Sequence, residues 1–373
     1  MVEIVKDIYF QNSREIAEKK GWNPLVKYNV FIRSQLPFMF GGKRFVQPVL
    51  DTFTDNYEFF YNDGDMVPAG MATLLTYTGH YQSIGEIEGH IIGMISETTR
   101  AANEMIPLTR AAGDTPWLYF GARHRAPEVD IYWSYAALLA GAAGIASVPT
   151  AQKLGVKAKG TVPHALCLVA GDTLLAAKGY GETFEDRQII ILPDTWGREI
   201  SDSIEVLKYF GKRLSGVRLD THRERLCEGC HEFETVEEAI ESEHPVVRMI
   251  MDRFDQAGRS AGGQRITNRE FHEHVFGKGV TVESAFFLKD ALCNHGGEHV
   301  QIILTSGFYP RKIEIFKAFD TPVDLLGIGV SVPFMATSDI VEKENENGEL
   351  KRCCKVGRYE NDFNEDGRFV SVK

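Results

Sequence analysis

The chain has 373 residues, enough for a barrel with a smaller second domain, and its 43% hydrophobic and 25% charged residues are ordinary for a soluble globular enzyme. A formal net charge of −11 argues against nonspecific nucleic-acid binding, because such binding needs a basic surface. No run approaches the roughly 20 apolar residues of a membrane span, and the N-terminus lacks the pattern of a signal peptide. With six cysteines, few for this length, these features predict a cytoplasmic protein with no nucleic-acid or membrane partner.

The N-terminal part, residues 1–116, has the pattern of an α/β sandwich domain. Residues 50–112 predict strand, turn and then helix, with an imperfect alternation over 72–77 and an apolar helical side over 85–103. Residues 1–50 mix a helical pattern over 13–20 with an aromatic and basic loop. We expect this extension to form an extra layer or an oligomer contact.

From residue 117 to 335, short apolar runs alternate with helical patterns. The predicted strands are residues 117–120, 189–192, 216–221, 300–304 and 323–326. The predicted helices are residues 128–142, 197–213, 235–256, 282–294 and 310–319. The later strands each end next to a carboxylate, a hydroxyl or glycines. Such units predict a parallel β/α barrel, irregular and partly open, with its active site at the carboxyl ends of the strands.

Two segments lie outside this repeat. Residues 222–279 exceed what one barrel unit requires, and their many glutamates predict a solvated acidic helix. Residues 336–373 predict a hairpin near 342–348 and a strand over 351–358. We expect this tail to return to the N-terminal sandwich domain and complete it.

The segment around His164 is the strongest candidate for chemistry. Residues 157–161 predict a short extended segment that ends at Pro163-His164, before a run of small and apolar residues. An imidazole just past a strand end can face a cleft, although a lone histidine is more often a structural one. The polar residues at the other strand ends favour the functional interpretation.

These residues form an ordered set of motifs. The motifs are Phe120-Gly121-Ala122-Arg123-His124, Gly160-Thr161-x-x-His164, Asp194-Thr195, Val217-Arg218-Leu219-Asp220-Thr221, Ser306-Gly307 and Gly327-Ile328-Gly329. In order and spacing the set resembles nicotinate phosphoribosyltransferases, which share their fold with quinolinate and nicotinamide phosphoribosyltransferases. The likeness covers most of residues 53–335 and includes Thr54-Asp55-Asn56-Tyr57, which is similar to the family's entry motif.

The resemblance implies a role for each motif in the transfer of phosphoribosyl from phosphoribosyl pyrophosphate. Asp194 and Asp220 would bind the ribose and stabilise its cationic anomeric carbon, although either aspartate alone is more often a helix cap. Amides of Ser306, Gly307, Gly327 and Gly329 would bind phosphate, with Thr221 beside them. Arg218 would neutralise the pyrophosphate or the 5-phosphate.

The resemblance also implies residues for the pyridine base. Arg123 would grip the carboxylate of nicotinate in bidentate fashion, with His124 and Arg125 as second choices. Tyr57 would stack on the ring and reach across the interface of a dimer. We therefore expect a homodimer or a multiple of dimers.

Three cofactors or co-substrates are expected. Mg²⁺ should accompany the pyrophosphate, held by substrate oxygens and water. By family analogy, His164 would accept a phosphoryl group from ATP while Asp194 orients its ring. Cys227 and Cys230 have metal-ligand spacing and, with Cys353 and Cys354, could bind Zn²⁺; inert thiols are the competing interpretation.

The sequence thus predicts a nicotinate phosphoribosyltransferase of NAD biosynthesis that makes nicotinate mononucleotide. A decarboxylating quinolinate phosphoribosyltransferase is the nearest alternative. It is disfavoured because quinolinate has two carboxylates, and few basic residues besides Arg123, Arg125 and Arg218 lie near the predicted strand ends. A non-catalytic, ligand-sensing relative is the alternative from another class.

Overall fold

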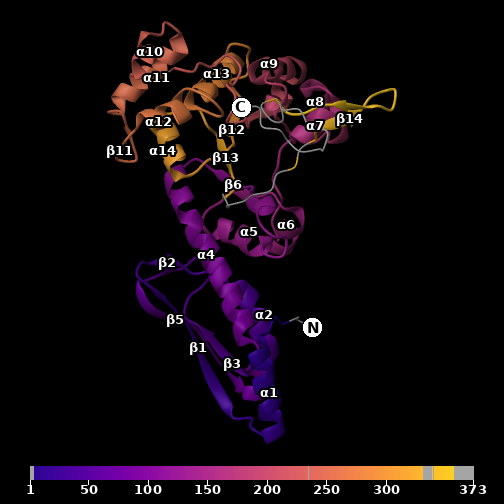
Figure 1. Ribbon diagram of the computed structural model, residues 1–373, viewed down its shortest axis with the longest axis vertical. Helices are drawn as coiled ribbons and strands as arrows, with labels where there is room; N and C mark the ends of the chain where they lie inside the picture. The colour runs from indigo at the N-terminus through magenta and orange to yellow at the C-terminus, as the bar shows by residue number, and fades with distance from the viewer. Residues whose placement is uncertain (1–3, 234, 331–337, 339, 357–373) are drawn as a thin grey trace, which may run out of the picture. The chain divides into compact units, whose positions relative to one another are not determined.

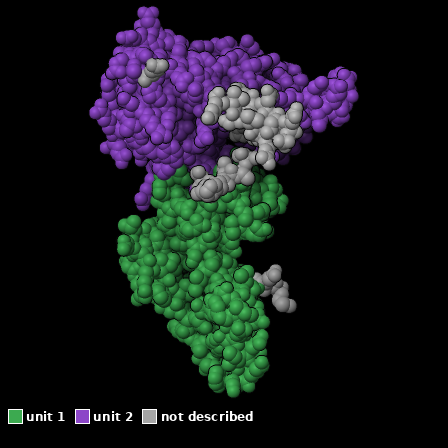
Figure 2. Space-filling view, viewed as in Figure 1, with its two compact units in different colours: residues 1–109, 121–158 green, residues 110–120, 159–373 purple. Residues whose placement is uncertain are grey.

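The computed structural model describes residues 4–233, 235–330, 338 and 340–356 (Figure 1). The chain divides into two compact units, coloured separately in Figure 2. Unit 1 comprises residues 1–109 and 121–158, and unit 2 comprises residues 110–120 and 159–373. The sequence predicts a domain boundary at residue 116 instead. That boundary assigns residues 121–158 to the barrel, whereas in the structure they group with unit 1.

Unit 1 is built on a three-stranded antiparallel sheet in the order β1-β5-β3. Its strands are β1 (Leu25–Ser34), β2 (Phe38–Met39), β3 (Asn56–Phe59), β4 (Met66–Val67), β5 (Gly70–His80) and β7 (Gly144–Ile145). Its helices are α1 (Ile8–Lys20), α2 (Lys43–Phe53), α3 (Tyr81–Ile84), the first 22 residues of α4 (Glu88–Ala112), the 3₁₀ turn η1 (Gly121–His124), α5 (Asp130–Leu139) and α6 (Val148–Leu154). Two of the short strands, β2 and β4, pair with each other.

The core of unit 1 lies between this sheet and its helices. Alternate residues of β1 are more buried, because successive side chains of a strand point to opposite faces. Tyr28 and Tyr77 stack across β1 and β5 with ring centroids 4.9 Å apart. Leu74, Ile84 and Ile91 are fully buried in the same cluster. The predicted sandwich is thus present, although residue 50 lies in a helix rather than in a strand.

Unit 2 contributes five strands to a parallel sheet, in the order β6-β13-β12-β9-β8. They are β6 (Trp117–Tyr119), β8 (Ile189–Ile191), β9 (Leu214–Leu219), β12 (Gln301–Leu304) and β13 (Leu325–Ile328). The helices between them are α7 (His164–Ala170), α8 (Thr173–Thr183), α9 (Glu199–Phe210), α10 (Val236–Glu241), α11 (Pro245–Gln256), α12 (Asn268–Glu270), α13 (Val282–Cys293) and α14 (Pro310–Ala318). Shorter pieces are η2 (Pro193–Thr195), η3 (Gly211–Arg213), β10 (Ser260–Ala261), β11 (Gln264–Arg265), the π-helix η4 (Phe271–Val275), β14 (Glu342–Glu344) and β15 (Leu350–Arg352).

The register of this sheet aligns the carboxyl ends of its strands. Leu304 pairs with Leu219 on one side and with Leu326 on the other. Ile328 pairs with Tyr119. The polar residues that follow these strands therefore emerge at one edge of the sheet, as expected for a parallel β/α fold. The predicted fold class is confirmed.

The structure differs from the predicted elements in three places. Residues 157–161 form no strand, and the next residue is joined to β8 by a hydrogen bond from Val162 N to Ile190 O. The helix predicted over 235–256 is two helices, since Pro245 starts a new one. The described part of the tail groups with unit 2, where β14 and β15 form the expected hairpin.

None of the helices within the described residues is both long enough and apolar enough to cross a membrane.

Candidate active site

His164 and Asp194 form the centre of the site. His164 is the first residue of α7, and Asp194 lies in η2, directly after β8. Both carboxylate oxygens of Asp194 are 3.1 Å from His164 Nε2. Burial opposes the charge of Asp194, but His164 and Lys355 outweigh it, and the pKa of the carboxyl lies well below its usual range. The pair is a fixed carboxylate–imidazole contact.

Lys355 is a second cation on the same carboxylate. Its ammonium contacts Asp194 Oδ2 and donates to the main-chain carbonyl of Asp220 at 2.6 Å. Only 1% of Lys355 is exposed. The next residue, Val356, donates its amide hydrogen to Thr195 O at 3.0 Å. Residues 355–356 therefore cover the ends of β8 and β9 and neutralise Asp194.

Asp220 and Arg218 lie side by side at the end of β9. Arg218 Nη2 is 3.5 Å from Asp220 Oδ2, and Nη1 donates to Thr161 Oγ1 at 2.6 Å. Arg218 Nε is buried without a hydrogen-bond partner in the described part of the chain. The guanidinium thus links β9 to the segment that leads into His164, and it retains a donor for a further anion.

The Ser306-Gly307 turn follows β12. Both residues have left-handed backbone angles, with φ of 78° at Ser306 and 73° at Gly307. This conformation is costly for serine, but its hydroxyl donates to Thr221 O at 3.2 Å. On β13, a Cβ on Gly327 would lie 2.5 Å from the Phe120 ring, so only glycine fits. The predicted phosphate loop is therefore a tight turn directly before α14, while Gly329 follows β13.

Lys312 lies beneath this turn, in the first turn of α14. Its Nζ donates to Ser306 O at 3.2 Å, and only 6% of the residue is exposed. Burial lowers the pKa of this lysine to about 8, and Asp220 opposes the shift. The site therefore has two buried lysines.

Thr221 belongs to a supporting network. Its hydroxyl donates to Glu199 Oε1 at 2.9 Å, and the same carboxylate pairs with Arg225. Arg225 also donates to Asp194 O at 3.0 Å. Because Thr221 and Glu199 are fully buried, the network holds the loops after β8 and β9 rather than facing solvent.

The residues predicted for the pyridine base belong to unit 1. Tyr57 lies on β3, where its hydroxyl donates a hydrogen bond to Asp51. This bond raises the pKa of Tyr57. Arg123 and His124 lie in η1, and Arg123 is exposed. Their roles remain predictions.

Two of the four predicted zinc ligands, Cys227 and Cys230, lie together in the structure. All six cysteines are reduced thiols, and Cys227 and Cys230 contact each other. Within the described ranges, which include Cys353 and Cys354, no group of three or more His, Cys, Asp or Glu side chains is arranged to hold a metal ion. The zinc site therefore stays a prediction without support from this geometry.

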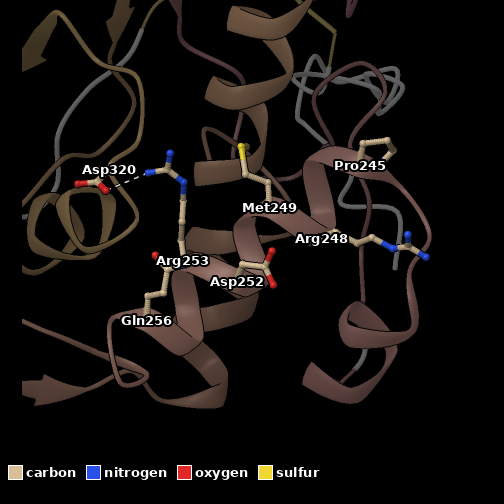
Figure 3. A pocket seen from close by; sticks show the side chains of 7 residues that line it. All are labelled: Pro245, Arg248, Met249, Asp252, Arg253, Gln256 and Asp320. Carbon is tan, nitrogen blue, oxygen red and sulfur yellow. Dashed lines mark hydrogen bonds and ion pairs between the residues drawn. The ribbon is translucent and has the colours of Figure 1, made fainter.

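A separate surface pocket lies along α11 (Figure 3) and has a volume of about 510 Å³. Its lining residues are Pro245, Arg248, Met249, Asp252, Arg253, Gln256 and Asp320. Arg253 already pairs with Asp320 at 3.0 Å, as the dashed line in Figure 3 shows. None of the predicted site residues lines this pocket, so we place the chemistry at the strand ends instead.

Comparisons with known proteins show which fold the chain shares. No family model matches the sequence. The chain is similar to nicotinate-nucleotide pyrophosphorylase from Pyrococcus furiosus, with 23% identity and a TM-score of 0.62 over 95% of this chain and 78% of that one. It is also similar to human nicotinic acid phosphoribosyltransferase, with 13% identity and a TM-score of 0.59 over 87% and 73%. NadC from Streptococcus pyogenes matches at 10% identity and a TM-score of 0.52 over 88% and 93%.

The chain has a phosphoribosyltransferase fold. In a parallel fold of this kind, chemistry occurs at the carboxyl ends of the strands. Asp220 directly follows β9, and Asp194 and Ser306 lie within three residues of the ends of β8 and β12. His164 contacts Asp194.

Sequence reasoning missed four charged residues of this phosphoribosyltransferase fold. They are Glu199, Arg225, Lys312 and Lys355. Lys312 could have been found, because it lies six residues after Ser306 in the first turn of a predicted helix. Lys355 lies in the predicted strand over 351–358, but nothing in the local sequence indicates its contact with Asp194.

Proposed function

We propose that the protein transfers phosphoribosyl from phosphoribosyl pyrophosphate to nicotinate, giving nicotinate mononucleotide and pyrophosphate for NAD biosynthesis. The observation that supports this proposal is the convergence of His164–Asp194, Asp220 and the Ser306-Gly307 turn at one edge of a parallel sheet. The fold shared with a nicotinic acid phosphoribosyltransferase supports it as well.

The reaction breaks the bond between the ribose anomeric carbon and pyrophosphate and forms a bond from that carbon to the ring nitrogen. Positive charge develops on the sugar, and negative charge develops on the leaving group. Carboxylates near the sugar stabilise the transition state, and Asp220 is suited to this task because its side chain is partly exposed. Arg218 would bind the departing pyrophosphate.

Magnesium would be bound mainly by the substrate. Asp194 is already neutralised by His164 and Lys355, and Asp220 lies beside Arg218. These carboxylates therefore do not form an open metal cage. Mg²⁺ on pyrophosphate oxygens, with water in the remaining positions, fits this arrangement and would offset the charge of the leaving group.

ATP coupling is part of the proposal, with His164 as the phosphoryl acceptor. Asp194 occupies Nε2, so Nδ1 is the ring nitrogen that would take the phosphoryl group. The carboxylate would then stabilise the charged ring through its Nε2 hydrogen. The proposal also includes a homodimer or a multiple of dimers, in which Tyr57 of one subunit stacks on the base in the other.

Quinolinate is the second candidate substrate, and the buried Lys312 favours it. The sequence argument against quinolinate was a shortage of basic residues near the strand ends. Lys312 adds one cation there, whereas the charge of Lys355 is already paired with Asp194. A quinolinate phosphoribosyltransferase would additionally release carbon dioxide.

One assay separates these candidates. The pure protein is incubated with phosphoribosyl pyrophosphate, Mg²⁺ and nicotinate, nicotinamide or quinolinate, with and without ATP, and mononucleotide formation is followed. We expect nicotinate to be used and ATP to stimulate its use. Turnover of quinolinate alone would replace the leading proposal, and no turnover with any base would favour a ligand sensor.

His164→Ala tests the coupling. We expect the variant to lose stimulation by ATP while it keeps a slow basal reaction, and His299→Ala, at an exposed histidine, to behave as the unmodified protein does. Equal loss of the basal and stimulated rates would show that His164 is not the phosphoryl acceptor.

A further inference from the structure

Lys312 is a buried charge that no predicted role explains. Lysine is almost never fully buried unless it is paired, because removing an ammonium from water costs several kcal/mol. The only hydrogen bond of Lys312 Nζ within the described chain is to Ser306 O, at 3.2 Å. An ammonium has three donors, so this contact leaves two of them for another group.

Burial lowers the pKa of Lys312 to about 8, so the ammonium is still mostly charged at neutral pH. The rings of Phe308 and Phe316 face the ammonium, with centroids 4.5 Å and 5.6 Å away. Asp220 is the carboxylate that favours its charge. From the π-helix η4, His274 adds no second charge at neutral pH, because burial and then Lys312 lower its pKa to about 4.

The backbone beside Lys312 is also suited to an anion. Tyr309, the residue that precedes α14, provides no side-chain cap for the helix. Pro310 has no amide hydrogen, and the amides of the next residues have no acceptor within the helix. Such a helix start favours negative charge, and the buried lysine is in its first turn.

We propose that Lys312 is a phosphate-binding residue, whose ammonium holds a phosphate group of the pentose substrate at the Ser306-Gly307 turn. This inference rests on the proposed function. If the lysine only pinned the turn, a neutral amide donor could do so without the cost of a buried charge. The phosphate dianion of a bound substrate would compensate the buried ammonium of Lys312, and this explains why a charged residue stands there.

The phosphate could be the 5-phosphate of the sugar or the pyrophosphate at its anomeric carbon. The chemistry that Lys312 recognises is the same in both. Ribose 5-phosphate and inorganic pyrophosphate, used as separate probes, distinguish the two sources without any need for turnover.

Calorimetric titration with each probe tests the assignment. The proteins are the unmodified chain, Lys312→Gln, Lys312→Arg and the control Lys317→Gln, which changes an exposed lysine on the same helix. Loss of one charge-assisted contact should weaken binding of one probe by about tenfold or more in Lys312→Gln. Lys317→Gln should bind as the unmodified protein does.

Proton uptake gives a readout that a purely structural role would not change. At pH 8 the free lysine is partly deprotonated, whereas ribose 5-phosphate is already a dianion. Pyrophosphate keeps a proton that it can lose on binding, and comparison with Lys312→Arg subtracts this loss. Binding should then draw up to about half a proton from solution, measured by repeating the titration in two buffers that differ in ionisation enthalpy. Lys312→Arg remains charged and should bind without this uptake.

Two results would overturn the assignment while the transferase proposal stands. One is that Lys312→Gln binds both probes with the affinity of the unmodified protein, while the unmodified protein turns over its substrate. The other is equal proton uptake by the parent chain and Lys312→Arg, which decides the question even if Lys312→Gln does not fold. Failure of the parent chain to bind either probe or to turn over any base would overturn both proposals.

Discussion

Asp194 is the residue on which most of the site's charge depends. Its carboxylate is fully buried and contacts both His164 and Lys355. A buried carboxylate is stable only when cations or hydrogen bonds compensate it. Because the fold lowers the pKa of Asp194, the charged carboxylate stabilises the fold fully at pH values above 3.8, the ordinary pKa of the group. This stabilisation is lost as the pH falls below that value toward the lowered pKa.

This pairing predicts strong coupling between Asp194 and Lys355. Asp194→Asn leaves a buried ammonium, and Lys355→Met leaves the carboxylate with His164 alone. Each single variant should lower the free energy of unfolding by about 3–5 kcal/mol. The double variant should be destabilised by less than the sum of the two, because it contains neither the buried carboxylate nor the buried ammonium and so leaves no unpaired charge between them. Urea denaturation of all four proteins at pH 7 measures the cycle, and additive losses would show that the two groups do not interact.

At the residue scale, the sequence identified side chains that directly follow strands. Asp194, Asp220 and Ser306 were predictable because each terminates an apolar run, and parallel strands bring such ends together. Lys355 was not predictable, because its contact with Asp194 spans 161 positions in the chain and depends on the path of the tail. The structure gives the positions of the side chains that follow strands, and their roles, like those of Tyr57, Arg123 and His124, stay predictions.

At the scale of elements, α9 shows how the loop after β9 supports the site. Glu228 accepts the amide hydrogens of Ile200 at 2.8 Å and Ser201 at 2.9 Å, at the start of α9. Unpaired amides at a helix N-terminus favour a carboxylate. Glu228 itself is held by its own amide, which donates to Glu199 Oε2 at 3.1 Å. The loop therefore caps a helix that begins a few residues after Asp194.

Removal of this cap should destabilise the fold. Glu228→Ala is expected to lower the free energy of unfolding by about 1–2 kcal/mol, the usual cost of losing an N-terminal cap. The exposed Glu224, on the same loop, provides a control, and Glu224→Ala should have almost no effect. Urea unfolding compares the two variants. Equal effects would mean that the carboxylate of Glu228 does not stabilise α9.

Periodicity predicted the parallel strands and several of the helices between them, because their burial follows the element's own repeat. The predicted helix over 282–294 is α13 (Val282–Cys293), with one residue of difference. The local sequence pattern gave a wrong prediction where a contact between distant residues determines the structure. Glu228 belongs to a glutamate-rich run that predicts a solvated helix, yet it caps α9, while α10 occupies only Val236–Glu241 of the run.

At the scale of the whole molecule, the two units are interleaved along the chain. Residues 110–120 group with unit 2 although both flanking segments group with unit 1. This short segment provides β6, which pairs with β13 from Leu326↔Trp117 to Ile328↔Tyr119. Trp117 and Tyr119 are each 1% exposed. No single cut in the sequence therefore separates the units without removing a strand from the sheet.

This connectivity predicts that the fragment 159–373 will not fold alone. Without β6, the edge of β13 and the apolar surface beneath Trp117 would be exposed, and an uncovered strand edge pairs with other chains. We expect aggregation in size-exclusion chromatography and no cooperative thermal transition. In a matched fragment, residues 110–120 precede residue 159 through a flexible glycine-serine linker of about 20 residues. That fragment should be monodisperse and unfold cooperatively, because it restores the pairing with β13. If both fragments aggregated alike, unit 2 would depend on unit 1 for more than this strand, and if both folded alike, β6 would be dispensable to the sheet.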